Sequence, residues 1–221
     1  MIKVITYNSI HRKTQDLLIQ LKLKGYQDVT VFATPWEDRV NFKPLIPHRN
    51  FKPYNFLTKD ICNRLGFKYN NIKSLDELNI SDYTLIAGSG IIPKKLTDSK
   101  KIINSHPAYL PYTRGLDSLK WAIFNNQPIG VTTHIISQEV DTGWLIKKQL
   151  LPLYQWDTFH SVAYRQYQME IEMLVDAIED VKKSKLEPIS NEYCEPKRRM
   201  PHKYEIKIKE KLDKIIKNKN V

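Results

Sequence analysis

Hydrophobic and polar positions change period along the chain in blocks that predict alternating strands and helices. Residues 1–8 and 28–34 are short runs rich in β-branched side chains, as is typical of strands. Between them, residues 14–26 place leucine and isoleucine at helical spacing and include Gly25, which can end a helix. A strand, a helix and a second strand in this order predict the start of a parallel α/β sheet.

The rest of the chain continues this pattern. Strands are predicted for residues 83–92 and 100–107, and helices for 58–69, 116–125 and 158–185, the last beginning near Asp157 or Thr158. Two strand-like runs within residues 127–153 are joined by a polar turn at 137–143, which predicts a β-hairpin. Residues 35–54 lack a clear period and predict a long surface loop, often a place of binding. The fold class is therefore α/β, with a mostly parallel sheet flanked by helices.

The composition adds constraints on function. The chain has 221 residues and ordinary globular usage, with 41% hydrophobic residues. No apolar run approaches the roughly 20 residues that span a bilayer, and the first residues do not resemble a leader. We therefore expect a cytoplasmic protein without a membrane partner. The two cysteines, Cys62 and Cys194, form no CxxC pair, so neither a disulfide framework nor a metal site is expected.

The net charge of +11 is concentrated at one end, where residues 197–221 carry ten Lys or Arg against three acids. Tyr204, Ile208, Leu212 and Ile215 recur there at helical spacing. This pattern predicts an amphipathic helix with one packed face and a solvated lysine face. The alternative is a surface for an anionic partner. We expect residues 1–190 to form a catalytic domain and residues 191–221 a basic C-terminal helical extension.

Candidate chemistry lies where the strand at 100–107 ends. Asn104 and His106 close that strand, and Asp141 follows in the turn of the hairpin. Ligands in open α/β sheets bind beyond the carboxyl ends of the strands. An amide donor, an imidazole and a carboxylate on neighbouring loops suit acyl transfer to an amine. His134, inside a strand, is expected to be a buried support for this site.

These residues belong to a longer motif, "DYTLIAGSGIIPKKL...KIINSHPAYLPYTRG...PIGVTTHIISQEVDTGWLI", between Asp82 and Ile146. In this stretch the sequence resembles the folate-dependent formyltransferases, a family that includes glycinamide ribonucleotide transformylase, methionyl-tRNA formyltransferase and the sugar N-formyltransferases. The resemblance implies a Rossmann-like formyltransferase fold. It also implies transfer of a formyl group from N10-formyltetrahydrofolate to a primary amine, with Asn104, His106 and Asp141 as the catalytic residues.

The resemblance assigns further residues to the folate co-substrate. They lie in two loops whose backbone would hold the pterin and flank the formyl group: Gly88, Ser89, Gly90, Ile91 and Ile92 in one, and Ser137, Gln138, Glu139 and Val140 in the other. It also suggests a homodimer.

The acceptor amine is the open question. The ribonucleotide enzyme needs a glycine-rich turn after the first strand, but "ITYNSIHRKTQ" has no glycine. The tRNA enzyme carries a further domain, whereas about 75 residues follow Ile146 here. We therefore expect the amine of a nucleotide-linked amino sugar, as in lipopolysaccharide biosynthesis. The alternatives are a glycinamide ribonucleotide-type or other small amine, and a non-catalytic relative that binds RNA or folate.

A nucleotide-linked sugar calls for cationic and aromatic groups around the cleft. The expected acceptor contacts are His11, Arg12, Arg114, Tyr164 and Tyr167, with Lys13, Trp36, Arg39 and Arg165 as further candidates. The basic tail has Tyr204 as its one aromatic residue, which argues against single-stranded nucleic acid as a partner.

Overall fold

The architecture was taken from a computed structural model, which describes residues 1–36, 43–49, 52–190 and 194–218. One eight-stranded sheet forms its centre, in the order β3-β2-β1-β4-β5-β6-β7-β8. The strands are β1 (Ile2–Tyr7), β2 (Val29–Thr34), β3 (Lys68–Asn71), β4 (Thr84–Ile86), β5 (Ile102–His106), β6 (Gly130–Ile136), β7 (Gly143–Leu150) and β8 (Glu187–Pro188). Strands β1 to β5 pair in parallel, while β6, β7 and β8 join antiparallel. The predicted mostly parallel α/β sheet is confirmed.

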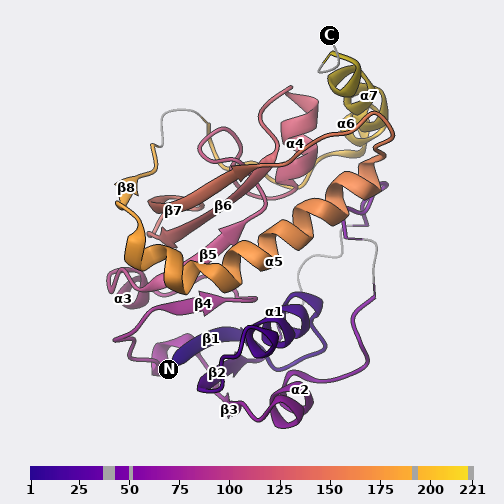
Figure 1. The fold of residues 1–221 in the computed structure, drawn as a ribbon. Coiled ribbons are helices and arrows are strands. Elements are labelled where there is room, and N and C mark those ends of the chain that lie inside the picture. Colours follow the sequence, from indigo (N-terminus) through magenta and orange to yellow (C-terminus); the bar gives the residue numbers. More distant parts are fainter. Residues whose placement is uncertain (37–42, 50–51, 191–193, 219–221) are drawn as a thin grey trace.

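Helices cover the sheet on both sides and at one end (Figure 1). They are α1 (Arg12–Leu23), α2 (Thr58–Leu65), α3 (Lys94–Thr97), α4 (Ser118–Phe124), α5 (Phe159–Lys183), α6 (His202–Glu205) and α7 (Ile208–Asn218), with a 3₁₀ turn η1 (Leu75–Glu77). The long helix α5 crosses the sheet beside α1 (Figure 1). It begins as the sequence predicts, because the Thr158 hydroxyl accepts a hydrogen bond from the Ser161 amide and so satisfies a free helix-end donor.

The side chains of β5 point alternately to the two faces of the sheet, and this determines which of them reach the site. Ile103 packs in the hydrophobic cluster that contains the inner face of α5. Ile102 packs in the cluster formed with η1 and α3, on the other face of the sheet. Because successive side chains of a strand point to opposite faces, Asn104 and His106 lie on the face of Ile102, and His106 stands at the carboxyl end of β5.

The C-terminal segment packs against the α4 end of the molecule (Figure 1). Ile208, Leu212 and Ile216 are buried in one cluster with α4, whereas Tyr204 and Ile215 are only partly buried. The predicted amphipathic helix is therefore present, with Ile216 rather than Ile215 at the centre of its packed face. The boundary proposed at residue 190 stays a prediction.

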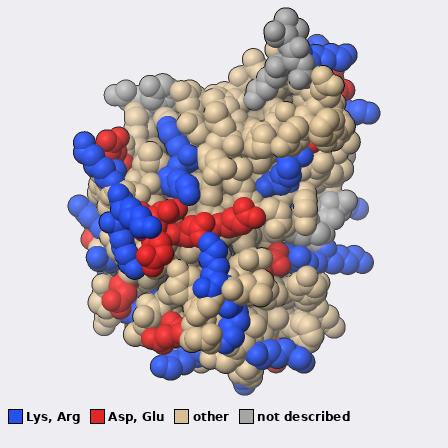
Figure 2. Space-filling view, viewed as in Figure 1, with Lys and Arg blue, Asp and Glu red and all other residues tan. Residues whose placement is uncertain are grey.

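Basic side chains are spread over the visible face of the molecule and alternate with acidic ones (Figure 2). Several basic residues of the C-terminal segment are engaged within the fold. Arg199 pairs with Asp117, and Lys214 pairs with Glu210 one helical turn away. Within the described residues, no helix is long and apolar enough to cross a membrane.

Candidate active site

His106 is held between an acidic and a hydroxyl group at the end of β5. Its Nδ1 lies 3.3 Å from Asp141 Oδ1, and its Nε2 lies 3.1 Å from Ser118 Oγ. The Ser118 hydroxyl donates its hydrogen to the Gly115 carbonyl, at 2.7 Å, so toward His106 it acts as an acceptor. Both ring nitrogens of His106 therefore face acceptors.

Asp141 is fixed from its other side by the backbone of Gly115. Its Oδ2 accepts a hydrogen bond of 2.7 Å from the Gly115 amide, and Asp141 itself adopts a left-handed conformation with φ of 53°. Gly115 has φ of 86°, and a Cβ there would lie 2.3 Å from the Lys197 carbonyl oxygen. Only glycine fits this position, because the carboxylate and the C-terminal segment approach it from two sides.

Asn104 is half-buried two residues before His106 on the same face of β5. No other described residue forms a hydrogen bond with its side-chain amide. The amide is thus available as a neutral donor beside the imidazole. The structure places His106 and Asp141 in direct contact, with Asn104 two positions before His106 on β5.

His134 supports this arrangement from the neighbouring strand β6, where it pairs with Asn104. The ring is fully buried, and its Nδ1 donates to the Thr142 carbonyl at 3.0 Å. Burial lowers the pKa of His134 from 6.5 to about 4, although Asp141 acts in the opposite direction. A neutral, buried ring that holds the residue after Asp141 agrees with the supporting role expected for it.

This low pKa leads to a prediction for stability. Between pH 6.5 and 4 the unfolded chain protonates His134 while the folded chain does not, so the free energy of unfolding falls as pH decreases. This loss of free energy of unfolding reaches about 3 kcal/mol at pH 4, and it vanishes above pH 6.5, the ordinary pKa of histidine. Urea unfolding at several pH values should show a weaker decline for His134→Gln than for wild type. The exposed His160→Gln serves as the control, and equal declines for wild type and His134→Gln would contradict the prediction.

The loops expected to hold folate flank this site. Gly88 lies so close to other residues that a Cβ would meet His11 Cε1 at 2.7 Å and the Tyr7 ring at 2.9 Å. Ile91 is 96% exposed, whereas Ile92 packs partly against the core. In the other loop, Gln138 donates to Asp98 beside α3, and Ser137 bonds to Thr142. The exposed apolar side chain of Ile91 in the first loop suits contact with a flat heterocycle such as a pterin.

Arg114, which the sequence analysis expects to contact the acceptor, binds backbone carbonyls of its own chain in this structure. Its side chain is 4% exposed and donates to the Val140 carbonyl from Nε at 3.0 Å and from Nη2 at 2.6 Å. Nη1 reaches the Cys194 carbonyl at 3.3 Å. The guanidinium therefore holds the loop just before Asp141 and ties it to the C-terminal segment. The backbone carbonyls of Val140 and Cys194 thus accept hydrogen bonds from all three nitrogens of the guanidinium.

This position predicts a distinctive kinetic effect for Arg114→Gln. The loop that carries Asp141 loses its anchor, and misplacement of a reacting group by about 1 Å costs on the order of 100-fold in rate. We expect kcat to fall at least about tenfold with little change in the acceptor KM. Steady-state kinetics, with exposed Arg64→Gln as the control, checks this. An increase confined to the acceptor KM would instead support the original prediction of direct contact.

The other expected acceptor contacts differ in whether they line the cavity that lies beside His106. Tyr167 lines it and donates from its hydroxyl to Asp16, at 2.7 Å. His11 instead bonds to Thr14, and Arg12 pairs with Asp16. Tyr164 is 52% exposed on α5 and does not line the cavity. Arg165 is bound by Asp157, Trp36 packs edge-on against Tyr7, and Arg39 lies outside the described residues.

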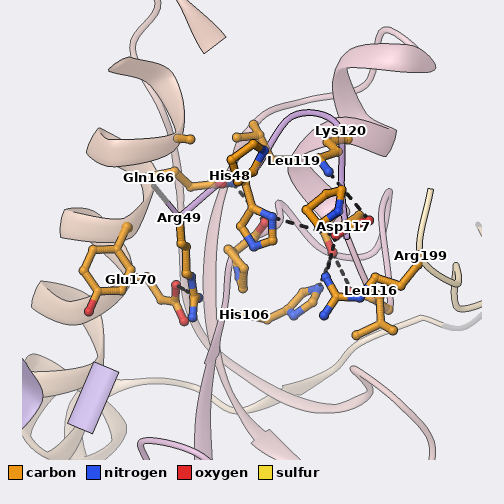
Figure 3. A pocket seen from close by; sticks show the side chains of 17 residues that line it. His48, Arg49, His106, Leu116, Asp117, Leu119, Lys120, Gln166, Glu170 and Arg199 are labelled. Carbon is orange, nitrogen blue, oxygen red and sulfur yellow. Dashed lines mark hydrogen bonds and ion pairs between the residues drawn. The ribbon is translucent and has the colours of Figure 1, made fainter. Parts of the chain in front are cut away.

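The cavity occupies about 480 Å³ beside His106 and contains ionisable residues that sequence reasoning missed (Figure 3). They come from four separate segments: His48, Arg49, Asp117, Lys120, Glu170 and Arg199. Glu170 is buried, and Lys13 Nζ lies 2.6 Å and Arg49 Nη2 lies 2.8 Å from its two oxygens. Burial alone would raise the pKa of Glu170, but the charges of Arg49 and Lys13 outweigh it and lower that pKa. The carboxylate is therefore ionised at neutral pH.

Comparison with known proteins shows which proteins this chain resembles. The sequence model of the family described as formyl transferase matches residues 13–178. A methionyl-tRNA formyltransferase of Thermodesulfovibrio yellowstonii is 30% identical over 122 residues, which cover 54% of this chain and 40% of that protein. A dTDP-4-amino-4,6-dideoxyglucose formyltransferase of Mycobacterium bovis is 34% identical over 91 residues, covering 40% and 39%. The matched regions thus span about two fifths of these relatives' own length.

A solved structure extends the similarity to nearly the whole fold. It is a sugar 3N-formyl transferase determined in the presence of dTDP and 5-N-formyl-THF. The match has a TM-score of 0.63 and 17% sequence identity, and it covers 96% of this chain and 78% of that one. At this identity the likeness establishes the fold.

Proposed function

Since the chain belongs to the formyl transferase family, we propose that it transfers a formyl group from N10-formyltetrahydrofolate to the primary amine of a nucleotide-linked amino sugar. The observation that carries the proposal is the placement of His106 between Asp141 and Ser118, with the Asn104 amide on the same face of β5. This arrangement provides two hydrogen-bond donors, Asn104 and His106, and one carboxylate, Asp141, at the end of β5.

The chemistry assigns a role to each of these groups. The acceptor amine attacks the formyl carbon, and negative charge develops on the formyl oxygen. Asn104 and His106 donate hydrogen bonds to that oxygen, the imidazole from Nε2, which would exchange its contact with Ser118 Oγ for the oxyanion. One such donor is typically worth about 10²- to 10³-fold in rate. Asp141 holds the imidazole in its charged form and takes the proton that the amine loses, directly or through water. Tetrahydrofolate then leaves as the nitrogen–carbon bond of the donor breaks.

The folate donor would lie along the two loops flanking the site. The exposed side chain of Ile91 and the backbone of residues 88–92 would face the pterin on one side, and residues 137–140 on the other. The close contact of Gly88 with Tyr7 and His11 leaves no room for a side chain and fixes the first loop against β1. We propose these contacts on the family resemblance and on this geometry together.

The sugar is favoured over glycinamide ribonucleotide by the loop after β1. Thr58 Oγ1, at the start of α2, donates to the Tyr7 carbonyl at 2.7 Å and is 3.0 Å from the Ser9 carbonyl. The start of α2 therefore covers this loop. The loop contains no glycine that would let a phosphate approach its backbone amides closely. The cavity beside His106 instead offers several charged side chains from other segments, which suits a larger anionic acceptor.

The proposal includes a cytoplasmic homodimer in lipopolysaccharide biosynthesis, with residues 1–190 as the catalytic domain and 191–221 as an extension. Neither nucleic acid nor membrane is part of it. The residue roles given to Asn104, His106 and Asp141 belong to the proposal as well.

A mass-spectrometric transfer assay tests the reaction. The protein is incubated with N10-formyltetrahydrofolate and a panel of dTDP- and UDP-linked 3-amino and 4-amino sugars, together with glycinamide ribonucleotide. We expect an amino sugar to gain the mass of one formyl group. A gain on glycinamide ribonucleotide alone would replace the proposed acceptor, and no gain on any amine would support the non-catalytic alternative.

A further inference from the structure

The cavity beside His106 is bounded by segments far apart in the sequence (Figure 3). One side is formed by α5, which contributes Gln166 and Glu170, and by residues 47–49. Another is formed by residues 115–120 and by Arg199 of the C-terminal segment. An acceptor whose amine reaches His106 would therefore extend along a wall to which the C-terminal segment contributes.

Two guanidinium groups lie on different sides of this cavity (Figure 3). Arg49 Nη2 is 2.8 Å from Glu170 Oε2, and Arg199 Nη1 is 2.9 Å from Asp117 Oδ1. The two carboxylate side chains are at most 1% exposed, whereas Arg49 is 35% and Arg199 42% exposed. Each buried carboxylate thus fixes one arginine while leaving part of that arginine accessible.

Both arginines retain donors for a ligand. A guanidinium has five N–H groups arranged in a rigid fork. Within the described part of the chain, each of these two side chains makes one hydrogen bond, to its carboxylate. The remaining N–H groups have the geometry that binds phosphate oxygens in pairs.

The surrounding charges favour an anion in this cavity. Lys13 pairs with Glu170, and Lys120 pairs with Glu205. With Arg49 and Arg199, the cations exceed the three carboxylates Asp117, Glu170 and Glu205 by one charge.

The pKa of His48 reflects its burial and the charges around it. Its Nδ1 is 3.8 Å from Asp117, which favours the charged ring. Burial nevertheless lowers the pKa of His48 from 6.5 to about 4, and the charges of Arg49, Lys120 and Arg199 lower it further than Asp117 raises it. The positive groups therefore dominate at this point of the cavity.

We infer that Arg49 and Arg199 form a subsite for the diphosphate group of the acceptor, so that the C-terminal segment is part of the acceptor site. This inference rests on the proposed function, since a nucleotide-linked sugar supplies the diphosphate. The loop after β1, closed by Thr58, does not offer that position. The basic C-terminal segment thereby acquires a role in recognising a small anionic substrate.

Calorimetric titration of the full chain with dTDP and UDP tests the subsite, with thymidine and uridine as ligands lacking phosphate. Wild type should bind at least one diphosphate, and Arg199→Gln should weaken that binding at least about tenfold, as expected for a charge-assisted hydrogen bond. Arg49→Gln should have an effect of similar size. Affinity for the matching nucleoside should be unchanged. The control is Arg198→Gln, because Arg198 is exposed and does not line the cavity.

Loss of the Arg199 pair leaves Asp117 buried with fewer partners, so folding is checked by thermal unfolding. Arg199→Lys keeps a cation beside Asp117 but removes the fork, and it should still weaken diphosphate binding several-fold with the fold intact. In NMR titrations, dTDP or UDP should raise the pKa of His48 in wild type. Normal diphosphate affinity in a folded Arg199→Lys and in Arg49→Gln, or an equal loss for the nucleoside, would overturn the subsite.

The binding assay separates this inference from the proposed reaction. Diphosphate binding that depends on both arginines supports the subsite even if no amine is formylated. Formylation of an amino sugar with an unchanged acceptor KM in Arg49→Gln and Arg199→Lys would refute the subsite while the reaction stands. Binding of neither dTDP nor UDP to wild type would refute it directly.

Discussion

Asp141→Asn is expected to lower kcat for formyl transfer by about 10³-fold while the acceptor KM changes little. The amide cannot accept the amine's proton, and the substitution removes the negative charge that lies 3.3 Å from His106 Nδ1. Loss of general-base action typically costs 10²- to 10⁴-fold. An amide oxygen can still accept the Gly115 hydrogen bond, so the loop is expected to keep its shape.

Steady-state kinetics over a range of pH measures this effect. Asp82→Asn is the matched control, because Asp82 is an exposed carboxylate paired with Lys3 far from the site. Its kcat should equal that of wild type. A profile for Asp141→Asn that is merely shifted along the pH axis, with wild-type activity at its optimum, would contradict the roles assigned to the pair.

His106→Ala is expected to reduce kcat/KM by at least about 10²-fold, because a charged donor to the developing oxyanion is lost. Folate affinity should change by less than threefold, since the predicted folate loops do not depend on the imidazole. Two variants give the comparison. Ser118→Ala keeps the imidazole and removes one acceptor from Nε2, so its loss should stay below about tenfold. His160→Ala, on the exposed face of α5, should behave as wild type.

Single-turnover kinetics and equilibrium binding of tetrahydrofolate measure the two quantities separately. Retention of more than a tenth of wild-type kcat/KM in His106→Ala would show that the imidazole is not the principal donor. An equal loss in Ser118→Ala and His106→Ala would instead mean that the position of the ring, rather than its hydrogen bond to the substrate, dominates.

The central part of the site could be predicted from sequence because its residues occupy short, contiguous motifs. Asn104 and His106 are two positions apart on one strand, and strand alternation places them on one face. Asp141 lies in a hairpin turn whose limits follow from the flanking apolar runs. These are local signals, and the structure places Asp141 in contact with His106.

The residues around the cavity could not be predicted in the same way. Arg49, Glu170 and Arg199 come from a loop, a helix and the C-terminal segment, and they meet only through the fold. In sequence, Glu170 resembles any polar residue of an amphipathic helix, although it is 1% exposed. Its signal would have been the helical spacing from Tyr167, which places the carboxylate on the inner face rather than the solvated one.

Two strands were not predicted from the sequence, each for a different reason. β3 (Lys68–Asn71) is a polar edge strand whose side chains are mostly exposed, so it lacks a hydrophobic pattern. β8 (Glu187–Pro188) consists of two residues, one of them proline, and pairs only with β7. Backbone hydrogen bonds to a neighbouring strand, rather than burial of side chains, hold both in place.

The most direct test of the account follows the formyl carbon itself. N10-formyltetrahydrofolate labelled with ¹³C in the formyl group is mixed with excess wild-type protein and the amino sugar identified in the transfer assay, and the label is followed by NMR. The account predicts that one formyl carbon moves to the sugar amine per donor consumed in wild type, and that transfer is at least about 10²-fold slower in His106→Ala and in Asp141→Asn. Label that remains on the folate, or that reaches the amine equally fast in the variants, would contradict it.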